Sequence, residues 1–172
     1  MKPRLIILSD LWGREKSDWV SDYVQQLKHK FEIQFYDCCE LGAIDRSNYT
    51  EESLHIQFVN GGIEKVIENL LETEKNQIDI LAFSIGGTIA WKAALKGLDV
   101  RNLCAVSSTR LRFEEDIPNG VIKPYYGEND INKPSISWFE KYSINFEIIK
   151  NKEHNFYIQK EFATSICNEI LN

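Results

Sequence analysis

The chain has 172 residues, of which 43% are hydrophobic and 27% are charged, a balance typical of one globular domain. Its formal net charge of −6 argues against DNA, RNA or an anionic membrane as the main partner, because binding to phosphate groups requires a basic surface. The apolar run near the N-terminus, Leu5 to Leu8, is too short for a signal peptide or a membrane-spanning helix.

The cysteines give no indication of a metal site or a disulfide framework. There are four of them, and none belongs to a C-x-x-C pair: Cys38, Cys39, Cys104 and Cys167. Scattered cysteines of this kind are typical of proteins in a reducing compartment. We therefore expect a cytoplasmic protein that has no structural metal and no cofactor.

The first half of the chain alternates between strand and helix signals. Residues 4–8 form a short apolar run that predicts a parallel strand buried on both faces, and residues 31–36 are predicted to be the second strand. Between them, apolar side chains recur at helical spacing over residues 19–27, with Ser17 as the expected N-cap. The longest irregular stretch, residues 37–52, is either a loop over a functional site or a surface excursion.

The same alternation continues to the C-terminus. Further strands are predicted at 78–83, 103–108, 121–127 and 145–150, and helices at 63–71, 88–95, 136–142 and 162–170. Gly97 is expected to end the helix before it, and Pro124 indicates a strand edge or a bend. This order predicts an α/β fold in one domain spanning residues 1–172. We expect a three-layer sandwich with a mostly parallel sheet of about six strands and helices on both faces.

The segment DILAFSIGG joins a predicted strand to a predicted helix at Ser84. A tight turn there lifts the serine clear of the sheet, and it requires small neighbours, which Ala82 and Gly86 provide. The pattern resembles the G-x-S-x-G nucleophile elbow of the α/β-hydrolase superfamily, with Ala82 in place of the first glycine. The alternative is a serine that caps the helix of an ordinary α/β domain.

Two later motifs resemble the remaining members of a Ser-His-Asp triad, in the chain order of that superfamily. In YYGEND, Asp130 follows the end of a predicted strand, although these residue types also form ordinary polar turns. In KEHNFY, His154 follows the last predicted strand. His29 and His55 fit less well, because one ends an amphipathic helix and the other precedes both the serine and the acid.

The resemblance implies a minimal, cap-less hydrolase in which Ser84 is the nucleophile, His154 the general base and Asp130 its orienting acid. It also implies an oxyanion hole. The backbone N–H of Ile85 is one expected donor, and that of Leu11, after the first strand, is the other, with Trp12 as the runner-up.

The loop after the first strand departs from the superfamily, because it has Ser9-Asp10 where hydrolases commonly have His-Gly. A carboxylate directed at an oxyanion would oppose catalysis, so we expect Asp10 to point away or to be hydrogen-bonded elsewhere. We expect Trp12 to line the substrate pocket, the alternative being a partly exposed core aromatic. Other aromatics near the motifs indicate an apolar substrate group: Tyr125, Tyr126, Trp138 and Phe156.

Taken together, the resemblance implies hydrolysis of a carboxylic ester or thioester, with a small-molecule or carrier-attached acyl substrate. The same triad would also serve a peptidase or an amidase. A binding module that keeps the fold without catalysis remains a second class of function. A flavodoxin-like nucleotide binder fits less well, because the loop after the first strand has a single glycine. The oligomeric state is not predicted.

Overall fold

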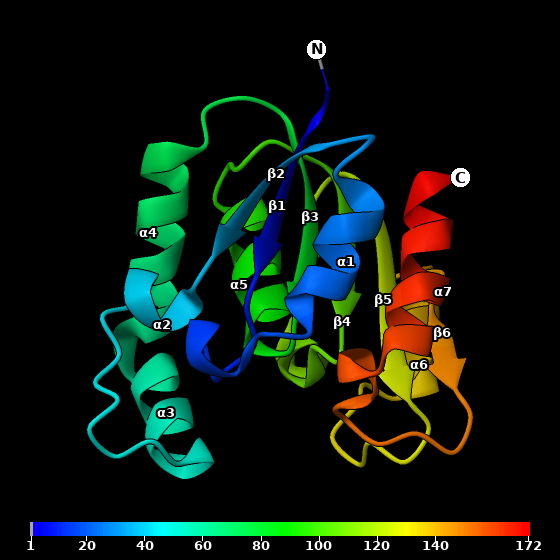
Figure 1. Cartoon of the computed structure of the whole chain (residues 1–172). Helices are drawn as coiled ribbons and strands as arrows, with labels where there is room; N and C mark the ends of the chain where they lie inside the picture. Colours follow the sequence, from blue (N-terminus) through cyan, green and yellow to red (C-terminus); the bar gives the residue numbers. More distant parts are fainter. Residues whose placement is uncertain (1) are drawn as a thin grey trace.

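The computed structural model describes residues 2–172 and contains one six-stranded sheet in the order β2-β1-β3-β4-β5-β6 (Figure 1). All neighbouring strands are parallel. The bounds are β1 Arg4–Leu8, β2 Glu32–Tyr36, β3 Ile78–Phe83, β4 Val100–Val106, β5 Val121–Gly127 and β6 Glu147–Ile149.

Helices cover both faces of the sheet, so the predicted three-layer α/β architecture is confirmed (Figure 1). One face packs against α1 (Val20–Leu27) and α7 (Lys160–Leu171), which lie side by side. The other face packs against α4 (Ile63–Thr73), α5 (Ile85–Leu95) and α6 (Ile136–Lys141).

Alternate residues of each strand enter the two cores, because successive side chains point to opposite faces of a sheet. In β1, Ile6 and Leu8 belong to the core under α4 and α5, whereas Leu5 and Ile7 belong to the core under α1 and α7. The central strand β3 is buried along its whole length. The continuous apolar runs seen in the sequence follow from burial on both faces.

The stretch expected to be irregular contains two short helices. Residues 38–41 form α2 (Cys38–Leu41), which is capped by the Asp37 carboxylate. A further helix, α3 (Glu51–Gln57), is capped by Thr50 and is joined to α4 by a kinked segment, Phe58–Gly62, in which Asn60 and Gly61 have non-helical backbone angles. In Figure 1, α3 lies beside the carboxyl-terminal end of the sheet, towards which the strand arrows point.

Of three local predictions made from the sequence, one is wrong and two are confirmed. The prediction that Ser17 is the N-cap of α1 is wrong, because its hydroxyl donates to the Gly13 carbonyl and the helix begins at Val20. Gly97 follows the last turn of α5 with a φ of 106°, as expected of a helix stop. Pro124 lies opposite β4 only, and pairing of β5 with β6 begins at the next residue, so the predicted edge position is confirmed.

All four cysteines are buried and carry free thiols. Within residues 2–172, none of the helices combines the length and the apolar composition needed to span a bilayer.

Candidate active site

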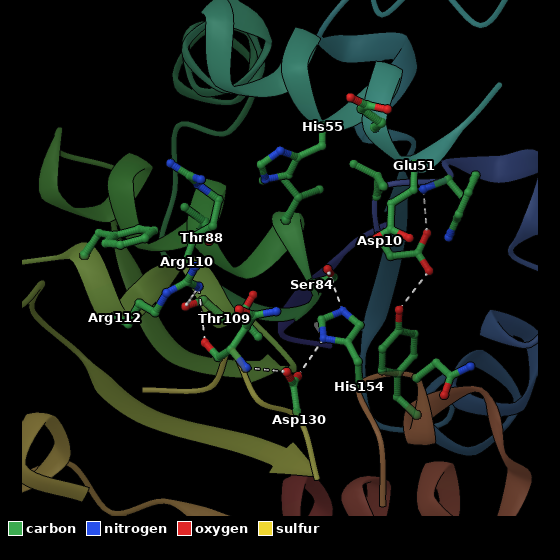
Figure 2. Close-up of a pocket in the computed structure, with 18 residues that line it drawn as sticks. Asp10, Glu51, His55, Ser84, Thr88, Thr109, Arg110, Arg112, Asp130 and His154 are labelled. Atoms are coloured by element: carbon green, nitrogen blue, oxygen red, sulfur yellow. Dashed lines mark hydrogen bonds and ion pairs between the residues drawn. The ribbon is translucent and has the colours of Figure 1, made fainter. Parts of the chain in front are cut away.

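A cleft of about 890 Å³ opens at the carboxyl ends of the strands, where the loop after β1 and the start of α5 meet (Figure 2). The chain runs outward from β1 to β2 and then returns to β3 on the other side of β1. In open parallel sheets, such a reversal of strand order separates the adjacent loops and leaves a crevice. The pairing of Leu8 with Ala82 brings the loop after β1 beside Ser84.

Ser84 occupies the turn between β3 and α5 in a strained backbone conformation, with φ 50° and ψ −117°. A non-glycine residue at positive φ persists only where its surroundings fix it. Its N–H donates to the Val106 carbonyl of β4 at 2.7 Å. Two residues later, a Cβ on Gly86 would lie 2.5 Å from the backbone oxygen of Ser9. Gly86 is therefore required for the close approach of α5 to the loop after β1.

The side chains of Ser84, His154 and Asp130 form one hydrogen-bonded series across three loops (Figure 2). The Ser84 Oγ lies 3.0 Å from His154 Nε2, and His154 Nδ1 lies 2.7 Å from Asp130 Oδ2. The loop that carries His154 passes close to the end of β5, since a Cβ on Gly127 would lie 2.3 Å from the Lys152 carbonyl oxygen. The strand-end glycine thus allows the acid and the histidine to meet.

The environment of Asp130 keeps its carboxyl group ionised. Its side chain is 3% exposed, whereas that of His154 is 40% exposed. Burial raises the pKa of Asp130, but the hydrogen bond and charge of His154 and the N–H of Asn132 bring the net pKa below its ordinary value. An ionised Asp130 accepts the Nδ1 proton of His154, which leaves Nε2 free to accept the Ser84 proton.

The neighbouring carboxylate, Glu128, has a different partner. Its side chain accepts a hydrogen bond from the Asn151 N–H at 2.9 Å, and no bond to His154 is present in residues 2–172. Of the two acids in YYGEND, only Asp130 has the geometry to orient the imidazole.

Both residues predicted to supply the oxyanion donors, Ile85 and Leu11, line the cleft together with Ser84. The Ile85 N–H belongs to the first residue of α5, and both it and the Leu11 N–H lack a hydrogen-bond acceptor within residues 2–172. The Trp12 N–H, the runner-up, is occupied, because it donates to Asp10 Oδ1 at 3.0 Å. The hydrogen-bond pattern therefore favours Leu11 over Trp12 as the second donor.

Asp10 is held by two hydrogen bonds within the site (Figure 2). Besides the Trp12 N–H, it accepts the hydroxyl proton of Tyr157 at 3.0 Å, so the carboxylate is hydrogen-bonded elsewhere, as expected. The residue is only 3% exposed, and burial raises its pKa from 3.8 to about 6, against the lowering effect of these hydrogen bonds. The Tyr157 contact ties the histidine loop to the loop after β1.

Trp12 lines the cleft, and its ring is held in place by its neighbours. Tyr49 packs edge-on against it with ring centroids 5.5 Å apart, and the Lys16 Nζ lies 3.7 Å from the ring centroid. The other aromatics expected near the substrate do not line the cleft: Tyr125, Tyr126 and Phe156 are buried in the two cores, and Trp138 packs against one of them. Phe113 and Tyr157 line it instead.

Sequence reasoning missed one wall of the cleft. It is formed by His55 of α3 and by Arg110 and Arg112 of a short 3₁₀ helix, Thr109–Phe113, after β4. His55 was considered only as a candidate triad base. The arginines lie in RLRF, whose clustered positive charge was the one available signal in the sequence.

No group of three or more His, Cys, Asp or Glu side chains with metal-binding geometry is present in residues 2–172. Two of the cleft carboxylates have other partners: Asp130 pairs with His154, and Asp10 is bound by Tyr157 and Trp12.

No family model matches the sequence, and no curated protein matches it, but many solved structures do. A protein from Xanthomonas campestris pv. campestris, assigned to the alpha/beta superfamily of hydrolases, is 17% identical with a TM-score of 0.69, over 99% of this chain and 98% of that one. Mouse alpha/beta hydrolase domain-containing protein 10 is 10% identical with a TM-score of 0.70, over 99% and 88% of the two chains.

Est1E from Butyrivibrio proteoclasticus, in a structure with ferulic acid bound, is 12% identical with a TM-score of 0.70, over 98% of this chain and 88% of that one. Identities this low establish the architecture alone, and the architecture agrees over nearly the whole length of each chain. The chain therefore has the α/β-hydrolase fold.

Proposed function

We propose that this protein is a serine hydrolase that cleaves a carboxylic ester or thioester through an acyl-enzyme intermediate. The observation that carries the proposal is the hydrogen-bonded series from Ser84 Oγ to His154 Nε2 and from His154 Nδ1 to Asp130, at 3.0 and 2.7 Å. Structures that share the fold include esterases and other hydrolases, which supports the same class of activity.

In this mechanism, Ser84 Oγ attacks the acyl carbonyl while His154 Nε2 accepts its proton. Asp130 holds the imidazole in position and stabilises its charged form. His154 then protonates the leaving group, and water later attacks the acyl-enzyme with His154 again as the base. The N–H groups of Ile85 and Leu11 would stabilise the oxyanion, each by about 3 kcal/mol.

The test compares hydrolysis of p-nitrophenyl acetate by the wild type and by Ser84→Ala. The proposal requires Ser84→Ala to lose hydrolysis while keeping the circular dichroism spectrum of the wild type. Ser165→Ala removes an exposed hydroxyl from α7 and is the matched control, which should retain wild-type turnover. Equal turnover by Ser84→Ala and Ser165→Ala would refute the proposal.

Two alternative functions are consistent with the same geometry of the cleft. A peptidase or amidase would use the same three residues, and matched anilide substrates distinguish it from an esterase. A non-catalytic binding module would keep the cleft without turnover, and the absence of His-Gly before Leu11 is the feature that favours it. The cytoplasmic location stays a prediction based on cysteine usage.

A further inference from the structure

The wall of the cleft formed by the 3₁₀ helix Thr109–Phe113 carries two arginines, Arg110 and Arg112, that form no ion pair within the described part of the chain. Arg110 is partly buried and lines the cleft. Within residues 2–172 it forms no ion pair and donates no hydrogen bond, whereas Arg4 and Arg101 each contact a carboxylate. The Arg110 guanidinium carbon lies 5.3 Å from the centroid of the Phe113 ring, and the charge of Glu114 also acts on it, but no carboxylate pairs with it directly. A cation that is partly removed from water without a paired carboxylate is costly, so a ligand that supplies a negative charge would be bound favourably.

The neighbouring groups leave Arg110 available. Arg112 Nη1 donates to the carbonyls of Thr109 and Asn132 at 2.8 and 3.2 Å, so its guanidinium is fixed by the protein. Burial and the charge of Arg112 lower the pKa of Arg110, but an arginine keeps its proton throughout the physiological range. The carboxylates of Asp10, Glu51 and Glu52 also line the cleft, and none of them pairs with Arg110 within the described residues. Figure 2 shows Asp10 and Glu51 on the side away from Arg110.

Thr88 supplies a second unpartnered polar group in this part of the cleft. It lies one helical turn beyond Ser84 and is 1% exposed, and its hydroxyl has no hydrogen-bond partner within residues 2–172. Buried hydroxyl groups are nearly always paired. Thr88 and Arg110 together provide a neutral donor and a cationic donor, a combination suited to an anionic oxygen.

The position of this wall decides which part of the substrate it would contact. His154 must protonate the leaving group, so the leaving group has to lie on the His154 side of Ser84. Figure 2 shows His55, Thr88 and Arg110 on the side of Ser84 away from His154. The acyl chain would therefore extend towards Arg110.

We propose that Arg110 binds a carboxylate at the far end of the acyl chain, so that the preferred substrates are esters or thioesters of dicarboxylic acids. This inference rests on the proposed hydrolase function and assigns its substrate class. The planar guanidinium can bind both oxygens of a carboxylate, and the low polarity of a partly buried site strengthens such a pair.

The experiment measures kcat/KM for mono-p-nitrophenyl adipate and its longer homologues, each against its methyl-capped neutral counterpart. In the wild type, the ratio of anionic to neutral kcat/KM should exceed one for at least one chain length. Arg110→Gln should lower that ratio about 10- to 100-fold, the loss expected for a charge-assisted hydrogen bond. Arg110→Glu should favour the neutral substrate, and added salt should reduce the wild-type preference.

Lys65→Gln is the control for net charge, because Lys65 is exposed on α4 and does not line the cleft, and it should keep the wild-type ratio. A wild-type ratio that Arg110→Gln leaves unchanged would overturn the inference. So would an Arg110-dependent preference only for substrates whose carboxylate is on the leaving group, such as acetyl esters of hydroxybenzoic acid.

Failure of this inference can be separated from failure of the hydrolase proposal. Ser84-dependent hydrolysis without a charge preference refutes only the role of Arg110. If no ester is hydrolysed, NMR titration of Ser84→Ala with free adipate and its homologues tests the anionic subsite separately from catalysis. Binding that Arg110→Gln abolishes supports the anionic subsite, and absence of binding overturns it.

Discussion

Replacement of Asp10 by asparagine should stabilise the protein in a pH-dependent manner. Burial raises the pKa of Asp10 from 3.8 to about 6 in the folded protein. At about 1.4 kcal/mol per pKa unit, this shift corresponds to about 3 kcal/mol of stability that the ionised carboxylate costs the folded state. Because Asp10 is 3% exposed, solvent screening reduces this cost little.

The sign follows from proton binding. Between about pH 4 and about pH 6, folded Asp10 holds its proton while the unfolded chain has released it, so the wild type loses stability as the pH rises through this interval. Asp10→Asn has no such titration. The advantage of Asp10→Asn over the wild type should therefore grow by about 3 kcal/mol between low pH and pH 7. In the wild type, the hydrogen bonds from Trp12 and Tyr157 favour the ionised carboxylate, and the pKa of about 6 already includes their effect. In Asp10→Asn, the side chain does not titrate, so its hydrogen bonds contribute equally at every pH.

Urea denaturation of both proteins at a series of pH values measures this difference directly. Asp45→Asn is a control of opposite sign, since hydrogen bonds from Ser47 lower the pKa of this exposed carboxyl group. Its stability relative to the wild type should fall as the pH rises. A constant free-energy difference between Asp10→Asn and the wild type at all pH values would refute the reasoning.

Three further predictions concern single side chains. Asp130→Asn should lower kcat in the ester assay about 10⁴-fold, because it removes the charged acceptor that fixes the His154 tautomer. Glu128→Gln should retain activity in the same assay. The reverse result would mean that the acid is misassigned. Gly86→Ala should lower the free energy of unfolding, measured by urea denaturation, by about 1–3 kcal/mol, because the added Cβ would collide with the Ser9 carbonyl oxygen. Unchanged stability would contradict that close approach. Thr88→Val should raise the free energy of unfolding by about 1 kcal/mol, since it removes a buried hydroxyl without a partner, and a loss of stability would show that the hydroxyl is satisfied.

The central strands could be predicted because burial on both faces leaves a direct mark on the sequence. β1 contains a short buried apolar run and β3 is buried along its whole length, whereas the edge strand β2 is largely half-buried or exposed. The turn at Ser84 could be predicted for a related reason, since a close approach of backbones requires Gly86 whatever the surrounding sequence.

Helix α3 could not be predicted from periodicity, because only Leu54 of its residues is buried. With a single core-facing residue, no apolar stripe appears, and the helix is held by the Thr50 cap and by its continuation into α4. The T-E-E-S sequence at its start was the local signal available. Since α3 carries His55, missing the helix also meant missing this wall of the cleft.

The hydrogen bond between Asp10 and Tyr157 depends on tertiary structure alone. Tyr157 is 147 residues away from Asp10 in sequence, in the 3₁₀ helix Phe156–Ile158 after the histidine loop. The sequence raised the question of where the carboxylate points, but only the fold brings the two loops together. The same is true of Arg110, whose lack of an ion pair within residues 2–172 depends on where the other charged side chains lie.

Labelling with a fluorophosphonate, followed by mapping of the adduct by mass spectrometry, tests whether Ser84 is an activated nucleophile. We expect a covalent adduct on Ser84 that is lost in His154→Ala, because the serine requires the base 3.0 Å away. A well-folded wild type that stays unlabelled, or a label on another serine, would contradict the account.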